Sequence, residues 1–269
     1  MDLNKFFYDL DEFIEKGMTE EAVHYVQQTM EEAEKAGDKQ ALVAIYNEAG
    51  SICRDFSKYS EAETYYLEAL KLIDEVGASG SESHGTTMIN YGTCLGNSGR
   101  YEEAAEAFGK AASILASLGM VDDYRMAALY NNMSWVAQEQ GKLEDAGEYL
   151  SKALLLLKAI PESEGEQAAS YTNLANLYWA QGLLDEAKVT LLKAVNIYKE
   201  QEFLKGEGRY AAAISALANI YFSEGDYEKC AILCREALQE IEKEFGRNDA
   251  WNVVSDNLAE AEAKAKENK

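Results

Sequence analysis

Apolar and small side chains recur along the chain at spacings of three and four residues, in stretches separated by short polar turns. Such spacing places the apolar residues on one face of an α-helix, so each stretch predicts an amphipathic helix. One example is the series Leu143, Ala146, Leu150 and Leu157. The chain has a single proline, Pro161, which leaves the predicted helices uninterrupted.

The predicted helices come in pairs, and the pair repeats about every 42 residues. A residue suited to a tight turn separates the two helices of each pair. A small residue follows five positions later, and another follows twelve positions later. Small residues at fixed spacing let two helices approach closely, so the pattern predicts helix pairs that stack on their neighbours. The turn residues are Gly17, Ser57, Gly99, Gly141, Gly182 and Gly225.

We therefore expect an all-α fold, an α-solenoid of about six helix-turn-helix pairs with a capping helix at its end. The last helical stretch has no second helix and carries polar residues such as Glu260 and Lys264 on its outer face. Its Asn257 to Ala259 stand in register with Asn173 to Ala175, two periods earlier. We expect a single domain over residues 1–269, with pairs at about 3–36, 38–77, 82–119, 123–160, 164–201 and 207–245 and the capping helix at 249–266.

The order of Asn, Gly and Ala residues within each pair resembles the tetratricopeptide repeat. It is clearest in YTNLANLYWAQGLLDEAKVTLLKA (171–194) and INYGTCLGNSGRYEEAAEAFGKA (89–111). The unit is longer than the usual ~34 residues, and in this it is similar to kinesin light chains and related cytoplasmic adaptors. The resemblance implies a right-handed superhelix whose first helices line a concave groove, where this family binds extended or helical peptides. Ser57, Cys230 and Cys234 depart locally from the pattern.

The residues ten, six and three positions before each turn residue share one face of the first helix, which the resemblance places in the groove. Most carry uncharged hydrogen-bonding groups, and three carry aromatic rings. An Asn amide both donates and accepts, so it can hold a peptide backbone, while aromatic residues form pockets that select side chains. We expect the peptide-binding residues to be Asn47, Arg54, Asn131, Trp135, Gln138, Thr172, Asn176, Trp179, Ser215, Asn219 and Phe222.

These residues also have a structural interpretation. Neighbouring asparagines of the family pattern, Asn90, Asn132 and Asn173, can tie one helix to the next. The aromatic residues can equally pack between neighbouring helices instead of facing a ligand. The sequence leaves both interpretations open.

The chain carries 25 Lys and Arg against 48 Asp and Glu, a formal net charge of −23. This excess repels phosphates and anionic lipids, so we expect neither a nucleic-acid nor a membrane partner. The partner that we expect is therefore a protein or peptide with a basic or neutral segment. The chain begins without the pattern of a signal peptide, and no apolar stretch reaches the ~20 residues of a membrane span. We therefore expect a cytoplasmic protein with reduced cysteines.

No catalytic, cofactor or metal pattern accompanies the repeat. His24 and His84 lie outside any nucleophile motif, and Cys230 with Cys234 lacks a second pair of zinc ligands. A clamp for C-terminal carboxylates needs several basic groove residues, and only Arg54 is expected there. We predict a non-enzymatic interaction module, an adaptor or scaffold, without a cofactor. Two alternatives remain: a subunit that assembles through its convex face or terminal helix, and a peptide-responsive regulator without its own DNA-binding domain.

Overall fold

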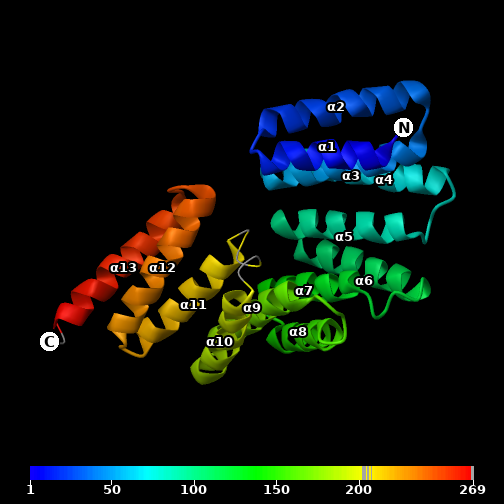
Figure 1. The fold of residues 1–269 in the computed structure, drawn as a ribbon. Helices are drawn as coiled ribbons and strands as arrows, with labels where there is room; N and C mark the ends of the chain where they lie inside the picture. Colours follow the sequence, from blue (N-terminus) through cyan, green and yellow to red (C-terminus); the bar gives the residue numbers. More distant parts are fainter. Residues whose placement is uncertain (202–203, 205, 207, 268–269) are drawn as a thin grey trace. The chain divides into compact units, whose positions relative to one another are not determined.

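The computed structural model describes residues 1–201, 204, 206 and 208–267. Within them the chain forms thirteen α-helices and no strand (Figure 1), which confirms the predicted all-α solenoid of helix hairpins. Residue 207, where the sixth pair is predicted to begin, lies outside the described residues. The helices are α1 (Leu3–Glu15), α2 (Thr19–Ala36), α3 (Lys39–Asp55), α4 (Tyr59–Glu75), α5 (Glu82–Asn97), α6 (Tyr101–Ser117), α7 (Tyr124–Glu139), α8 (Leu143–Leu157), α9 (Glu164–Ala180), α10 (Leu184–Glu200), α11 (Arg209–Ser223), α12 (Tyr227–Phe245) and α13 (Asp249–Glu267).

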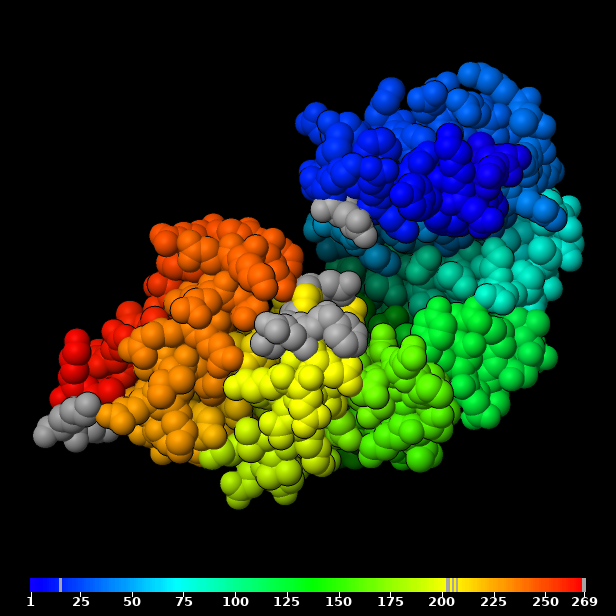
Figure 2. Space-filling model, in the orientation of Figure 1, coloured from blue at the N-terminus to red at the C-terminus, as the bar shows by residue number. Residues whose placement is uncertain are grey.

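Two compact units divide the chain: unit 1, residues 1–141, and unit 2, residues 142–269. In unit 1 the hairpins α1–α2, α3–α4 and α5–α6 precede α7. In unit 2 helix α8 precedes the hairpins α9–α10 and α11–α12, and α13 packs on α12. Within each unit, neighbouring helices follow one another in the order of the sequence (Figure 2), as expected when each hairpin contacts only its neighbours. A single superhelical domain over residues 1–269 stays a prediction.

At the six predicted turn residues, which follow the first helices of the pairs, the backbone has a positive φ, and backbone hydrogen bonds end the helices there. Gly17, which follows α1, has a φ of +66°, and the N–H of Met18 then donates to the carbonyl oxygen of Phe13 at 2.9 Å. Glycine adopts this conformation without a Cβ penalty. Ser57, which replaces a turn glycine in the second pair, has a φ of +58° and so adopts the same conformation with a side chain. The bends of the hairpins therefore depend on single residues.

Large residues of the second helices pack against small residues of the first helices. In unit 1, Tyr66 of α4 and Phe108 of α6 are fully buried, each 0% exposed. A Cβ added at Gly50 of α3 would lie 2.7 Å from the Tyr66 ring, and one at Gly92 of α5 would lie 2.6 Å from the Phe108 ring. A side chain at either glycine would collide with the ring, so these glycines permit the close approach of the helices.

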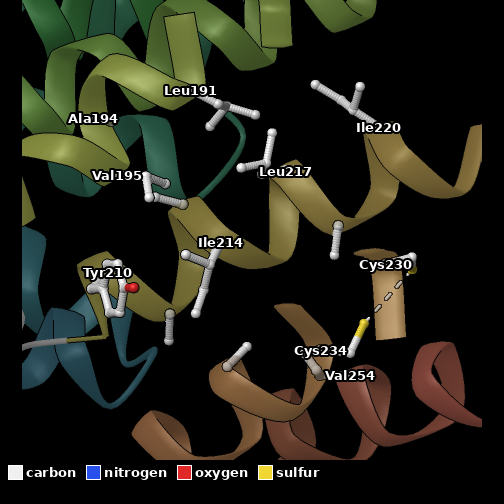
Figure 3. Packing of buried hydrophobic residues seen from close by; sticks show 14 of the residues in the cluster. Leu191, Ala194, Val195, Tyr210, Ile214, Leu217, Ile220, Cys230, Cys234 and Val254 are labelled. Atoms are coloured by element: carbon white, nitrogen blue, oxygen red, sulfur yellow. Dashed lines mark hydrogen bonds between the residues drawn. The ribbon is translucent and has the colours of Figure 1, made fainter. Parts of the chain in front are cut away.

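The core of unit 2 draws on five consecutive helices, α9 to α13. Leu217 of α11 points toward Leu191 and Val195 of α10, while α12 and α13 close the other side of the cluster (Figure 3). Cys230 and Cys234 of α12 are buried in it, with their sulfur atoms 3.9 Å apart. These two thiols act as small core residues. Among the helices that the structure describes, none is long and apolar enough to cross a membrane.

Candidate functional site

In unit 1 the predicted groove residue Asn47 ties two helices together. Its side chain is 8% exposed, and its amide N–H donates to Thr87 Oγ1 of α5 and to the carbonyl of Val43, both at 2.9 Å. Its amide oxygen accepts from Asn90 Nδ2 at 3.2 Å. These bonds occupy both the donor and the acceptor groups of the amide. Asn47 therefore holds α3 against α5. Asn90 takes part in the same contact, in agreement with the structural interpretation of the family asparagines.

Arg54 lies in the last turn of α3 in acidic surroundings. Its guanidinium pairs with Asp55 Oδ1 at 3.1 Å. Within the same helix, burial raises the pKa of the half-buried Glu48 carboxyl, the negative charges of Asp11 and Asp55 add to this rise, and Arg54 opposes it. A carboxylate ligand needs several uncompensated basic groups. This end of unit 1 does not supply them.

Asn131 and Gln138 lie half-buried on one face of α7. Asn131 Nδ2 donates to the carbonyl of Ala127 at 3.1 Å, one turn earlier. Gln138 Nε2 lies 3.4 Å from the carbonyl oxygen of Ser134, also one turn earlier. Both side chains thus lie along their own helix and are partly exposed.

Trp135, between them in sequence, is seated on the preceding hairpin. A Cβ at Gly96 of α5 would lie 2.6 Å from the indole ring. The ring also meets Tyr101 of α6 edge-on, with centroids 6.4 Å apart and planes at 89°. Packing against Gly96 and Tyr101 therefore holds Trp135 in place, and its side chain stays partly exposed.

In unit 2 three predicted residues meet around one hollow. Trp179 of α9 lines an open hollow of about 250 Å³ together with Asn219 and Phe222 of α11. Trp179 is 40% exposed, and the Phe222 ring is held edge-on by Tyr227, with centroids 5.2 Å apart. The amide of Asn219 is exposed and has no hydrogen-bond partner within the described part of the chain. The hollow thus combines apolar ring surface with an available amide.

The terminal helix completes this hollow. Asn257 and Glu260 of α13 line it, with Ser223 of α11 and the buried thiol of Cys230. Neither Asn257 nor Glu260 was predicted as a binding residue. Glu260 follows Asn176 by two periods, and so it occupies a groove position. Residues 257–259 stand in register with residues 173–175. Extending this register by one residue aligns Glu260 with Asn176 and so predicts its position in the groove.

The remaining predicted residues lie on the same helices outside the lining of the hollow. Thr172 is half-buried and donates to the carbonyl of Ala168 at 2.9 Å. Asn176 is exposed, with no side-chain partner in the described structure. The hydroxyl oxygen of Ser215 is buried and makes no hydrogen bond to any described residue. Asn176 is therefore the best placed of the three to contact a ligand.

Helix hairpins of this length, with small-to-large packing and left-handed turns, define an α-solenoid repeat protein. The tetratricopeptide repeat profile matches residues 41–117 and 125–200, more than half of the chain. The protein therefore belongs to the tetratricopeptide repeat family. No curated protein sequence matches it.

Solved structures share the fold at low sequence identity. BtubC (BKLC) from P. vanneervenii has a TM-score of 0.70 at 22% identity, over 82% of this chain and 90% of that chain. Kinesin light chain-like repeats from Podosopora anserina have a TM-score of 0.59 at 18% identity, over 74% and 93%. The apo form of the quorum sensor NprR from B. thuringiensis has a TM-score of 0.70 at 14% identity, over 93% and 68%. NprR has also been solved in complex with its cognate peptide NprX.

Proposed function

We propose that this protein is a non-enzymatic interaction module that holds a peptide or a helical segment against its first helices. The observation that carries the proposal is the hollow of unit 2, which Trp179, Asn219 and Phe222 line together. Two aromatic rings offer apolar contact area, and an unpaired amide can donate to and accept from a peptide backbone. Family membership and the complex of NprR with its cognate peptide support a peptide as the ligand.

The proposed binding surface keeps every member of the predicted set except Asn47. Asn47 is left out because its amide bonds to α5. Each unit is described by its own set of proposed residues. Unit 1 contributes Arg54, Asn131, Trp135 and Gln138, and unit 2 contributes Thr172, Asn176, Trp179, Ser215, Asn219 and Phe222.

The proposed setting is the cytoplasm, with the protein acting as an adaptor or scaffold. The free thiols of Cys53, Cys94, Cys230 and Cys234 suit a reducing compartment. The net charge of −23 favours neutral or basic protein segments over nucleic acids and anionic membranes. These are the partners that we propose.

Selection from a library of displayed random peptides tests this function. The wild type is compared with Trp179→Ala/Asn219→Ala and with a matched control, Leu155→Ala/Ile232→Ala. The control removes exposed apolar side chains of the second helices α8 and α12, 72% and 59% exposed. We expect the wild type and the control to enrich the same peptides. The hollow variant should bind them at least about tenfold more weakly, because aromatic anchors dominate such interfaces.

Circular dichroism and a thermal melt establish that each variant is folded. Peptides that bind the hollow variant as tightly as the wild type would place the binding surface elsewhere and overturn the proposal. Loss of the peptides from the control alone would move the site to the second helices. A wild type that enriches no peptide would likewise contradict the proposed function.

A further inference from the structure

The hollow of unit 2 contains a carboxylate without a counter-charge. Glu260 of α13 is exposed and lines the hollow beside Trp179, Phe222 and two amides. It has no ion-pair or hydrogen-bond partner among the residues that the structure describes. Of the residues that line the hollow, Glu260 is the charged one, and none is basic. The hollow is therefore negative and unneutralised.

Nearby lysines of unit 2 already have partners. Lys188 of α10 pairs with Glu224, the residue after the lining residue Ser223, at 2.6 Å. Lys229 of α12, next to Cys230, pairs with Asp226 at 2.6 Å. Because their own acidic partners hold both lysines, neither neutralises Glu260. Lys264, one turn after Glu260 on α13, pairs with Glu267 at 3.4 Å, so the carboxylate of Glu260 is available to a positive charge on a ligand.

We propose that this hollow is a pocket for one cationic side chain of the peptide ligand, and that it prefers arginine. A guanidinium stacks on aromatic faces, which Trp179 and Phe222 supply, and it pairs bidentately with a carboxylate such as that of Glu260. The amide oxygens of Asn219 and Asn257 accept its remaining N–H groups. The inference rests on the proposed function, because a peptide carries the side chain.

The size of the hollow agrees with this occupant. Its volume of about 250 Å³ is below the range of about 300 to 1,000 Å³ that is typical of pockets for whole small molecules. A single long side chain that enters from one side fits such a hollow. The apolar methylene groups of arginine then lie along the rings while the guanidinium reaches the carboxylate.

Two small probes test the pocket without any peptide. Acetyl-arginine methylamide and acetyl-citrulline methylamide are similar in shape, but only the first is charged. Each is titrated into the ¹⁵N-labelled 269-residue chain while the indole N–H signal of Trp179 is followed. The chain has three tryptophans, so Trp179→Phe assigns this signal. We expect a saturable shift with the arginine probe, at least about tenfold weaker binding of the citrulline probe, and weaker arginine binding at high salt.

Glu260→Gln keeps the shape of the side chain and removes its charge. We expect it to weaken binding of the arginine probe about tenfold and to leave the citrulline probe unchanged. Glu186→Gln is the matched control, because it removes an exposed carboxylate from α10 away from the hollow. It should bind as the wild type does. Equal responses to the two probes, no shift of Trp179, or an equal loss in the control would overturn the inference.

The two proposals can fail separately. If the arginine probe shifts Trp179 but the wild type enriches no displayed peptide, the pocket is real and the proposed peptide-binding function is wrong. If peptides are enriched but the arginine probe causes no shift, the proposed function stands and the cationic pocket is wrong. Enriched peptides that contain arginine and lose affinity with Glu260→Gln would support both.

Discussion

Trp135 of α7 lies so close to Gly96 of α5 that a Cβ at residue 96 would be 2.6 Å from the indole atom Cζ3. Gly96 stands three residues before its turn residue, where the other pairs carry large side chains. Because Gly96 has no side chain, the surface of α5 leaves room for the indole ring of Trp135. Trp135 belongs to α7, the first helix of the following pair. The large residues at the equivalent positions are Ile14, Arg54, Gln138, Trp179 and Phe222.

Gly96→Ala is therefore expected to destabilise the protein. Alanine gains about 1 kcal/mol over glycine in a helix, but overpacking costs about 1–3 kcal/mol and displaces the ring of Trp135. Gly109→Ala on α6 is the control, because a Cβ there meets nothing within 4 Å. That variant should gain up to about 1 kcal/mol. Urea denaturation compares the two, and an equal gain for both would contradict the close contact.

Asn47→Ala is expected to cost about 1–3 kcal/mol, because Thr87 Oγ1 loses its donor and Asn90 Nδ2 loses its acceptor. Thr87 Oγ1 accepts from Asn47 and is itself fully buried. A double-mutant cycle with Thr87→Val should give a coupling of about 0.5–3 kcal/mol in the free energy of unfolding. Asn176→Ala, at an exposed position, should change stability by less than about 0.5 kcal/mol. A coupling near zero would show that the bond does not hold the helices together.

Ser57→Gly is expected to stabilise unit 1 by about 1 kcal/mol. The φ of Ser57 is +58°, and a left-handed conformation costs a residue with a side chain about 1–2 kcal/mol. Part of this gain is offset by the greater freedom of glycine in the unfolded chain. Gly99→Ser, at an equivalent turn with a φ of +80°, should lose a similar amount. Thermal melts of the two variants test this prediction. A loss of stability with Ser57→Gly would show that the left-handed conformation of Ser57 does not destabilise the protein.

Glu48 makes the stability of the protein depend on pH. Burial and the nearby charges of Asp11 and Asp55 raise the pKa of this carboxyl in the folded state. The folded state then binds the proton more tightly than the unfolded chain does. The contribution of Glu48 is fully present below its unfolded pKa of about 4.3 and is lost as the pH rises through the raised folded pKa.

Glu48→Gln should therefore raise the melting temperature at about pH 8 and have little effect at about pH 4. The exposed Glu106→Gln on α6 serves as the control, with little change at either pH. Scanning calorimetry at the two pH values measures the difference. An equal effect of Glu48→Gln at both values would mean that ionisation of this carboxyl does not oppose folding.

The fold could be predicted because it depends on local spacing. Apolar periodicity predicts each helix, and glycines such as Gly17 mark the bends that the backbone makes at a positive φ. The role of an asparagine depends instead on the residue opposite it. Asn47 meets the hydroxyl of Thr87, forty residues away, while Asn219 meets no partner in the described structure. Spacing alone cannot distinguish these two surroundings.

Glu260 was missed for a related reason. Groove positions were counted back from turn residues, and no turn residue follows α13 in the pattern. The sequence pattern predicts a capping helix with Glu260 on its polar outer face. This placement is wrong, because Glu260 lines the hollow together with Trp179 and Asn219. Counting forward by two periods from Asn176 recovers the position.

The backbone bonds that end the helices at Gly17 and the later turns have an evolutionary consequence. Each hairpin carries the residue that defines its own bend, so its boundary does not depend on side chains in distant hairpins. A complete hairpin can be duplicated or deleted with its bend intact, and the flanking hairpins then meet a surface of the same kind. Insertion of a single helix would instead place a first helix at a position where the neighbouring hairpin packs against a second helix. Genes for such chains therefore change length most easily in whole repeats.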